Sequence, residues 1–190
     1  MANCETGFNW MLDNEDSQRL YESVPDPVQV EPNDSPDVVA AKDNAHAISG
    51  CNSFWFPKWY SMILLASQAQ KGAIVENFYK TEFWNSWFDQ LVSDELTKRY
   101  FDCSVNPSLY EATKILQGAL VSLGLHILED GEIGPQTVTA ANHQLDMSLV
   151  PAFKAMRLGY LQNLVTKYPR LAKYLGTAEH PGPWWIRATK

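Results

Sequence analysis

Apolar residues recur at helical spacing along most of this chain. The first such stretch predicts a helix from about Gly7 to Glu22. Its apolar positions are Phe8, Met11, Leu12 and Leu20. The helical pattern then stops, and it returns only from Pro57 onward.

The stretch between these helical regions is PDPVQVEPNDSPDVVAAKDN, which contains four prolines and five acidic residues with little periodicity. This composition predicts a long, acidic, partly extended surface loop over residues 23–47. Loops of this length commonly carry function, so its acids are candidates for a site.

The second helical region predicts a series of helices that continues almost to the end of the chain. Ser93, followed by two acids, is typical of a helix N-cap, and Asn106 before Pro107 predicts another helix start. No alternating pattern longer than a few residues indicates a strand. The predicted fold class is all-α, with six to eight helices.

The turn LEDGEIGPQTVTAAN, residues 128–142, contains acids and glycines that would suit an ion or phosphate loop. An EF-hand calcium loop needs Glu at its twelfth position, which counted from Asp130 is Ala141. A phosphate loop needs Lys and then Ser or Thr after its last glycine, and none follows Gly134. The turn is therefore interpreted as the entry to a helix beginning at Pro135, and neither a metal nor an organic cofactor is expected.

Composition and charge narrow the function classes. The chain has 190 residues, 45% of them hydrophobic, which is enough for one core or two small subdomains. Residues 1–56 carry ten acids and two bases, whereas residues 57–190 carry twelve acids and thirteen bases. Without a basic patch to displace counterions, nucleic acid is not an expected partner.

The first residues of the chain, its longest apolar run and its cysteines indicate the compartment in which the protein is made. The start MANCETGFNW lacks the parts of a secretory signal, and the longest apolar run, MILLA, is too short to span a bilayer. Synthesis in the cytoplasm without stable membrane insertion is expected. Cys4, Cys51 and Cys103 lack the close spacing of zinc or redox sites, so free thiols are expected.

An ordered series of motifs spans residues 72–187: AIVENFYKTEFW, YFDCSVNPSLYEATKILQGAL, DGEIGPQTVTAAN, PAFKAMRLGYLQNLVTKYP and PWWIR. Together they resemble the predicted peptidoglycan-binding half of the family 108 glycoside hydrolases, the lysozyme-like N-acetylmuramidases of phage endolysins and secretion activator proteins. The positions that carry the resemblance are Phe101, Asp102, Val105, Asn106, Ala112, Leu116, Gln117, Asp130, Gly131, Ile133, Gly134, Pro135, Thr137, Arg157, Tyr160, Trp184 and Arg187. The D-G-x-I-G-P-x-T phrase is interpreted as architectural.

The resemblance implies a lysozyme-like helical bundle, with a catalytic part at residues 1–90 and a peptidoglycan-binding-like part at residues 91–190, packed as one unit. It implies hydrolysis of the β-1,4 bond between N-acetylmuramic acid and N-acetylglucosamine. The implied partners are bacterial peptidoglycan and, for release or neutralisation, a holin, a secretion apparatus or an immunity protein. The activity would be exerted at the cell wall or periplasm by an endolysin or a secreted effector.

The resemblance also implies catalytic residues. The family's first helix ends in E-G-G-Y, whose Glu is the catalytic acid, and Glu15 matches it, although Asp16-Ser17 stand in place of the two glycines. Asp26, which precedes Pro27, is the expected partner. Such a pair would protonate the leaving oxygen and activate water or stabilise the developing positive charge. Glu22 and Glu31 are the alternative acids.

Binding residues are implied in the same way. Tyr79 and Trp84 match the family's Y-x-x-x-[YF]-W segment and, with Asn106, are the expected substrate contacts. The other aromatic residues between 55 and 88 are expected mainly in the core. An alternative function is a non-catalytic peptidoglycan-binding or adaptor protein, because two glycines would let the backbone approach a sugar where Asp16 and Ser17 would crowd it.

Overall fold

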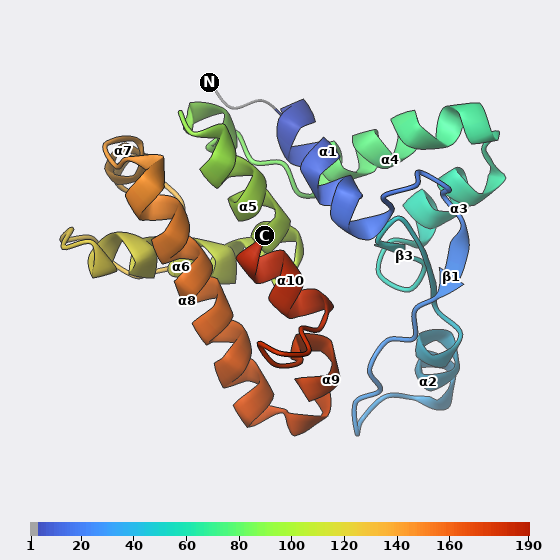
Figure 1. Cartoon of the computed structure of the whole chain (residues 1–190). Helices are drawn as coiled ribbons and strands as arrows, with labels where there is room; N and C mark the ends of the chain where they lie inside the picture. Colours follow the sequence, from blue (N-terminus) through green and yellow to red (C-terminus); the bar gives the residue numbers. More distant parts are fainter. Residues whose placement is uncertain (1–3) are drawn as a thin grey trace. The chain divides into compact units, whose positions relative to one another are not determined.

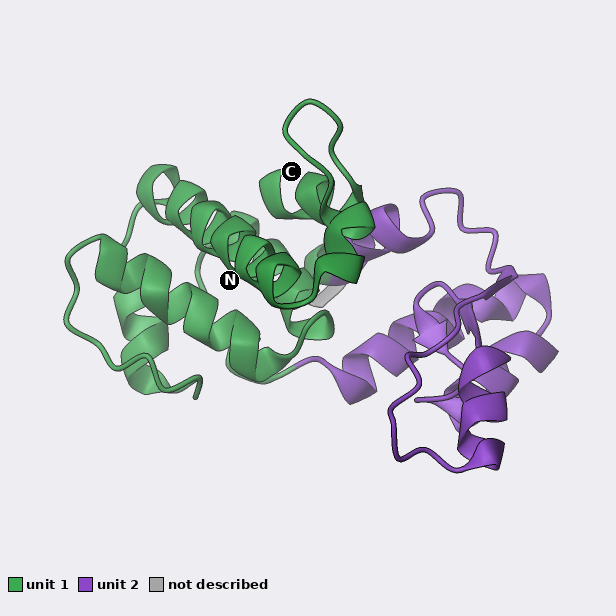
Figure 2. Ribbon diagram, turned by 90° about the horizontal axis from the view of Figure 1, so that it is seen from below, with its two compact units in different colours: residues 1–7, 85–190 green, residues 8–84 purple. Residues whose placement is uncertain are grey.

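The computed structural model describes residues 4–190 and divides the chain into two compact units. The N-terminal unit is Phe8–Trp84, and the C-terminal unit is Asn85–Lys190 together with Met1–Gly7 (Figure 2). Ten α-helices and one small sheet lie in the described residues (Figure 1). The mostly helical class is thus confirmed, and the number of helices exceeds the predicted six to eight because several of them are short.

The N-terminal unit contains a three-stranded sheet among its helices. Its elements are α1 (Cys4–Glu15), of which residues 8–15 belong to this unit, β1 (Ser23–Pro25), α2 (Pro36–Asp43), β2 (His46–Ile48), β3 (Cys51–Asn52), α3 (Pro57–Leu65) and α4 (Gln68–Glu82). The predicted loop at residues 23–47 therefore holds two strands and a helix, which corrects that prediction. Strands of three and two residues are too short for an alternating pattern to be visible in the sequence.

The first helix ends at Glu15, seven residues earlier than Glu22, where the sequence placed its end. The Asp16 carboxylate accepts hydrogen bonds from the backbone N–H groups of Leu20 (3.0 Å) and Tyr21 (2.8 Å). Arg19 and Tyr21 also have positive φ angles of 53° and 52°, which an α-helix does not allow. An acid that binds nearby backbone groups in this way competes with the helix and ends it.

The sheet has the order β1-β2-β3, with both pairs antiparallel. Ser49 and Gly50 connect β2 to β3, and both have positive φ angles, 47° and 80°. A two-residue hairpin turn with positive φ at both positions has the type I′ signature, which matches the twist of the flanking strands. Glycine suits the second position, whereas Ser49 is held there by contacts described below.

The core of the N-terminal unit is aromatic. Phe78 on α4 lies at its centre, with ring centroids 4.9 Å from Phe56, 4.7 Å from Tyr79 and 5.6 Å from Phe83. The apolar face of α1 packs into the same unit through Phe8, Met11 and Leu12, all of which are buried. Most of the aromatic residues in this region are thus structural, as expected.

The C-terminal unit is helical throughout. Its elements are η1 (Phe88–Gln90), α5 (Asp94–Val105), α6 (Leu109–Ser122), α7 (Pro135–Asn142), α8 (Asp146–Lys167), η2 (Pro169–Leu171), α9 (Ala172–Leu175) and α10 (Pro183–Thr189). Ser93 caps α5 by accepting the N–H of Leu96 at 2.9 Å, as predicted. The predicted N-cap at Asn106 is wrong: Ser108 caps α6, and Asn106 is the C-cap of α5.

Buried ion pairs join three helices of the C-terminal unit. Asp102 on α5 is fully buried, and its two carboxylate oxygens lie 2.8 Å from Arg157 of α8 and 2.6 Å from Arg187 of α10. All three residues belong to the motif series. They hold α5, α8 and α10 together, because the buried Asp102 carboxylate is the anion that both arginines contact.

The D-G-x-I-G-P-x-T phrase is held by one buried glutamine of α6. The Gln117 amide donates to Asp130 Oδ1 at 2.7 Å and to Thr137 Oγ1 at 3.3 Å, and its carbonyl accepts the N–H of Gly131 at 2.9 Å. Gly131 has a φ of 78°, a conformation that favours glycine. α7 then begins at Pro135, as predicted. The phrase is architectural, as interpreted from the sequence.

Two of the three cysteines can be placed. Cys51 and Cys103 are free and buried, and burial raises the pKa of their thiols to about 12 and about 11. The side chain of Cys4 lies outside the described residues. Buried, protonated thiols of this kind are unreactive, which fits a packing role.

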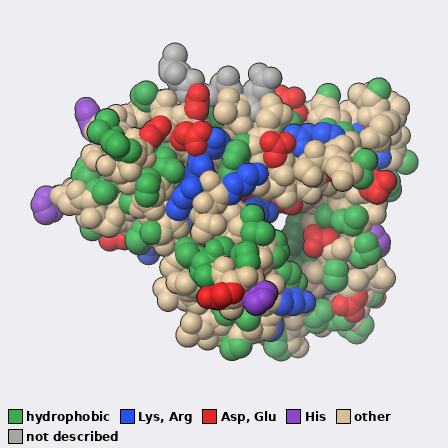
Figure 3. Space-filling model, in the orientation of Figure 1, with side chains coloured by type: hydrophobic (Ala, Val, Ile, Leu, Met, Phe, Trp, Pro, Cys, Tyr) green, Lys and Arg blue, Asp and Glu red, His purple; other side chains and the backbone are tan. Residues whose placement is uncertain are grey.

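On the face of the molecule in Figure 3, Lys and Arg side chains are interspersed with Asp and Glu. A mixed surface of this kind has only a weak field for polyanions. Among residues 4–190, no helix has both the length and the apolar character that crossing a membrane requires.

Candidate functional site

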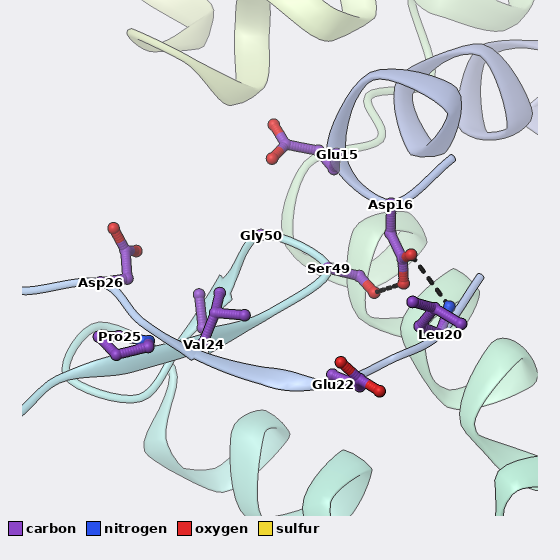
Figure 4. Close-up of a pocket in the computed structure, with 10 residues that line it drawn as sticks. Glu15, Asp16, Leu20, Glu22, Val24, Pro25, Asp26, Ser49 and Gly50 are labelled. Carbon is purple, nitrogen blue, oxygen red and sulfur yellow. Dashed lines mark hydrogen bonds between the residues drawn. The ribbon is translucent and has the colours of Figure 1, made fainter. Parts of the chain in front are cut away.

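Several carboxylates of the N-terminal unit line one cavity, of about 310 Å³. The wall is formed by the end of α1, the segment that follows it, β1 and the Ser49–Gly50 turn (Figure 4). We call it the acidic cavity, and it is lined by Glu15, Asp16, Leu20, Glu22, Val24, Pro25, Asp26, Ala47, Ser49 and Gly50. A concave site with several ionisable groups is the kind of place where proton transfer is arranged.

Glu15 is the last residue of α1 and is half-buried. Because Met11 and Leu12 anchor the buried face of α1, the position of Glu15 is set by the core of the unit. A methyl group added at Gly50 would lie 3.5 Å from Glu15 Oε2. The glycine turn therefore lies directly beside this carboxylate.

Asp26 follows β1 and is oriented by β3. Its N–H donates to Ala45 O at 2.9 Å, and its Oδ2 accepts a hydrogen bond from the amide of Asn52 at 2.7 Å. The same Asn52 amide donates to the carbonyl of Asp26 at 2.9 Å. Figure 4 shows Glu15 and Asp26 extending from the backbone on two sides of Gly50. The buried Asn52 was missed by sequence reasoning, since only the sheet brings it beside Asp26.

Asp16 connects the two loop segments of the cavity wall. Besides the N–H groups of Leu20 and Tyr21, its carboxylate accepts a hydrogen bond from Ser49 Oγ at 2.8 Å (Figure 4). Burial acts to raise the pKa of Asp16, but the hydrogen bonds from Tyr21, Ser49 and Leu20 outweigh it and hold the pKa below 3.8. Asp16 is thus stabilised as an anion that fixes the wall, a poor state for donating a proton.

Backbone strain is concentrated around this cavity. Among residues 4–190, the non-glycine residues with positive φ are Arg19, Tyr21 and Ser49. Asp16 accepts hydrogen bonds from two of them, Tyr21 and Ser49. Arg19 in turn donates to the carbonyl of Asp16 at 2.8 Å. Strained residues persist where neighbouring contacts over-determine them, and they are enriched at functional sites.

The prediction that Tyr79 contacts substrate is corrected by its burial. The side chain is only 1% exposed, and its ring packs on Phe78. Its hydroxyl donates to the carbonyl of Ser49 at 2.7 Å. A methyl group at Gly50 would lie 2.3 Å from that hydroxyl. Tyr79 therefore supports the Ser49–Gly50 turn from the core and presents no surface to a ligand.

The remaining predicted residues are distributed between the two units. Glu22 lines the acidic cavity, but it lies in the segment before β1 and not at a helix end. Glu31 is outside the lining, in a turn where its N–H donates to Asp34 Oδ2 at 2.6 Å. Trp84 is half-buried after α4 and is also outside the lining. Asn106 lies in the C-terminal unit, where it lines a small pocket with Trp184.

Residues 111–177 match a family model described as a predicted peptidoglycan domain. The match lies within the C-terminal unit and runs from α6 past α9. It supports peptidoglycan as the partner and the cell wall as the place of action, and it confirms that part of the sequence resemblance. No curated protein and no solved structure matches the chain. The resemblance of the N-terminal unit to a glycoside hydrolase stays a prediction.

Proposed function

We propose that this protein hydrolyses the β-1,4 bond between N-acetylmuramic acid and N-acetylglucosamine in bacterial peptidoglycan. The observation that carries the proposal is the acidic cavity, which brings Glu15 and Asp26 from separate elements to one wall in a chain whose other unit matches a peptidoglycan domain. Glycoside hydrolysis generally uses two carboxyl groups that flank the scissile bond.

Glu15 is the proposed general acid. It ends a helix whose other face is locked in the core, so its position is set by packing rather than by a mobile loop. It would protonate the glycosidic oxygen as the bond to the sugar carbon breaks. Gly50 lies beside this carboxylate, and the space that a side chain at Gly50 would need is filled by the Tyr79 hydroxyl.

Asp26 is the proposed second carboxylate. It would activate a water molecule or stabilise the positive charge that develops on the sugar ring. The Asn52 amide, which donates to Asp26 Oδ2, leaves the carboxylate acceptor capacity on Oδ1 and restricts its orientation. Restricted orientation of this kind is what positions a base or nucleophile before the reaction.

A non-catalytic peptidoglycan-binding protein is the second candidate. The observation in its favour is Asp16, whose carboxylate lines the cavity where the resembled family has glycine. This carboxylate accepts hydrogen bonds from Tyr21 and Ser49, and it takes up space in the cavity wall next to Glu15. On this alternative, the chain would bind peptidoglycan without cleaving it.

The test is release of soluble fragments from purified peptidoglycan, with identification of the new reducing end after borohydride reduction. A muramidase yields reduced muramic acid ends. We expect the wild type to produce them, Glu15→Gln to produce none, and Glu31→Gln, which lies outside the cavity lining, to behave like the wild type. Binding to peptidoglycan without release of fragments would exclude hydrolysis and support the non-catalytic binding protein. Reduced glucosamine ends would show that the other glycosidic bond of the glycan strand is cleaved.

A further inference from the structure

A second cavity, of about 300 Å³, lies in the C-terminal unit where α6 and α8 pack together. Figure 1 shows these two helices crossing each other. We call it the α6–α8 groove. It is lined by Glu111 and Lys114 of α6, Glu129 of the connection to α7, and Gly159, Tyr160 and Asn163 of α8, among others. All of these residues lie within the region that matches the peptidoglycan domain.

Gly159 is a helix-interior glycine that packing does not require. Apart from its chain neighbours and the backbone of its own helix, no atom lies within 4 Å of the position that a methyl group at Gly159 would occupy. Gly118 on α6 differs, because a methyl group there would meet Met156 Cε at 2.7 Å and Glu129 Oε2 at 3.1 Å. Glycine in a helix interior is less stable than alanine. A glycine kept on a cavity wall without a packing reason is suited to close approach by a ligand.

The charges around the groove indicate what kind of ligand would fit. Glu111 and Glu129 contribute two carboxylates and Lys114 one ammonium group, and none of these makes an ion pair with another described residue. The Lys114 ammonium instead lies 5.7 Å from the ring of Tyr110. A ligand that carries both an amine and a carboxylate would complement this arrangement.

Polar and aromatic groups add further contacts. Tyr160 is half-buried, and burial together with the Glu111 carboxylate raises the pKa of its phenol. The hydroxyl is therefore a neutral donor and acceptor at physiological pH. Asn163, one turn along the same helix, offers an amide that can pair with a peptide bond.

We propose that the α6–α8 groove binds the stem peptide of peptidoglycan, with the side-chain amine of its diamino acid facing Glu111 and Glu129 and a carboxylate facing Lys114. The inference rests on peptidoglycan being the substrate, as in the proposed function. The glycan strand is the less favoured occupant, because its N-acetylated sugars have no amine to complement two carboxylates. The backbone of the peptide would pass over Gly159.

The probe is the free stem tetrapeptide of a diaminopimelate-type wall, titrated calorimetrically into the full chain. The variant is Gly159→Ala, and the matched control is Gln162→Ala, an exposed position on the same helix that does not line the groove. We expect the wild type and Gln162→Ala to bind the tetrapeptide equally. Gly159→Ala should bind about tenfold more weakly, because its methyl group occupies ligand space, while its melting temperature is equal or higher.

Two further arms identify the ligand group. The peptide-free disaccharide should not compete with the tetrapeptide, and acetylation of the diaminopimelate amine should weaken binding. The inference is overturned if the tetrapeptide does not bind saturably, if Gly159→Ala binds it as tightly as the wild type does, or if the disaccharide displaces it.

Fragment release from peptidoglycan, measured in parallel, separates this inference from the proposed function. Fragment release without tetrapeptide binding would overturn the inference that the groove binds the stem peptide, and the proposed muramidase activity would stand. Tetrapeptide binding that depends on Gly159 without fragment release would support the groove and contradict the muramidase.

Discussion

The two units use their acidic residues in different ways. In the C-terminal unit, Asp102 is fully buried between two arginines, and its ion pairs with them hold three helices together. In the N-terminal unit, Glu15, Glu22 and Asp26 line a cavity. An acid surrounded by matched buried charges is suited to architecture, whereas an acid on a cavity wall is available to a substrate. The difference in surroundings, and not the residue type, separates the two roles.

The largest expected effect is the loss of stability when the buried Asp102 of the C-terminal unit is replaced. Asp102→Asn removes the fully buried anion that Arg157 and Arg187 both contact, which should lower the free energy of unfolding by about 3–5 kcal/mol. Urea denaturation followed by circular dichroism measures this change. The control is Asp94→Asn, an exposed acid in the first turn of the same helix, which should cost only a few tenths of a kcal/mol, on the order of a helix-dipole interaction. Equal effects of the two variants would mean that the buried Asp102 ion pairs do not hold the three helices together.

The second prediction concerns the turn before α7. Gln117→Ala leaves the Gly131 N–H and the Asp130 carboxylate without their buried partner and should cost about 3 kcal/mol of unfolding free energy. Gln162→Ala, at an exposed position, should be close to neutral. Since the turn is architectural, the folded fraction of Gln117→Ala should keep its peptidoglycan-degrading rate. A rate that falls while the protein remains folded would give this turn a direct role in activity.

The third prediction concerns the buried hydrogen bond between Tyr79 and Ser49 in the N-terminal unit. Tyr79→Phe removes the hydroxyl that donates to the carbonyl of Ser49 and should cost about 1–2 kcal/mol, because that bond is buried. Tyr60→Phe is the control, since the hydrogen bond of Tyr60 to Ser23 is exposed and its loss should cost less. Thermal unfolding of the two variants gives the comparison. If Tyr79→Phe is no less stable than Tyr60→Phe, the Tyr79 hydroxyl does not support the turn.

The smallest expected effect is a pH dependence that arises from Asp16. Its hydrogen bonds hold its folded-state pKa below the usual value of an aspartate, so the stabilisation that it provides is present above that usual value and is lost as the pH falls through the folded-state pKa. Asp16→Asn should therefore be less stable than the wild type at neutral pH, by about 1 kcal/mol, since Asn keeps one acceptor oxygen. The two should converge under more acidic conditions. Denaturation midpoints of the two proteins between pH 2 and pH 7 test this.

The sequence predicted the helical part of the fold well because helices have a local period. Ser93 and Pro135 mark helix starts that the structure confirms. The sheet could not be predicted, because its pairing joins Val24 to Ala47 across a helix. Short strands that pair across such a separation leave no periodic signal.

For the candidate site, a similar limit applies. Glu15 and Asp26 could be named from a motif, and the structure brings both to one cavity. Asn52 could not be named, because its role depends on the register of β3. Tyr79 was assigned to the wrong role, since an aromatic residue within a motif can face either the core or a ligand, and only its burial distinguishes the two.

Glu15 is proposed to perform chemistry and not to maintain the fold. The most direct measurement is the rate of soluble fragment release from purified peptidoglycan by the wild type and by Glu15→Gln, together with the melting temperature of each. We predict that the rate falls by about 10²–10⁴-fold, the usual contribution of a general acid, with little change in melting temperature. A Glu15→Gln variant that releases fragments at the wild-type rate, or loses activity only as it loses its fold, would contradict the account.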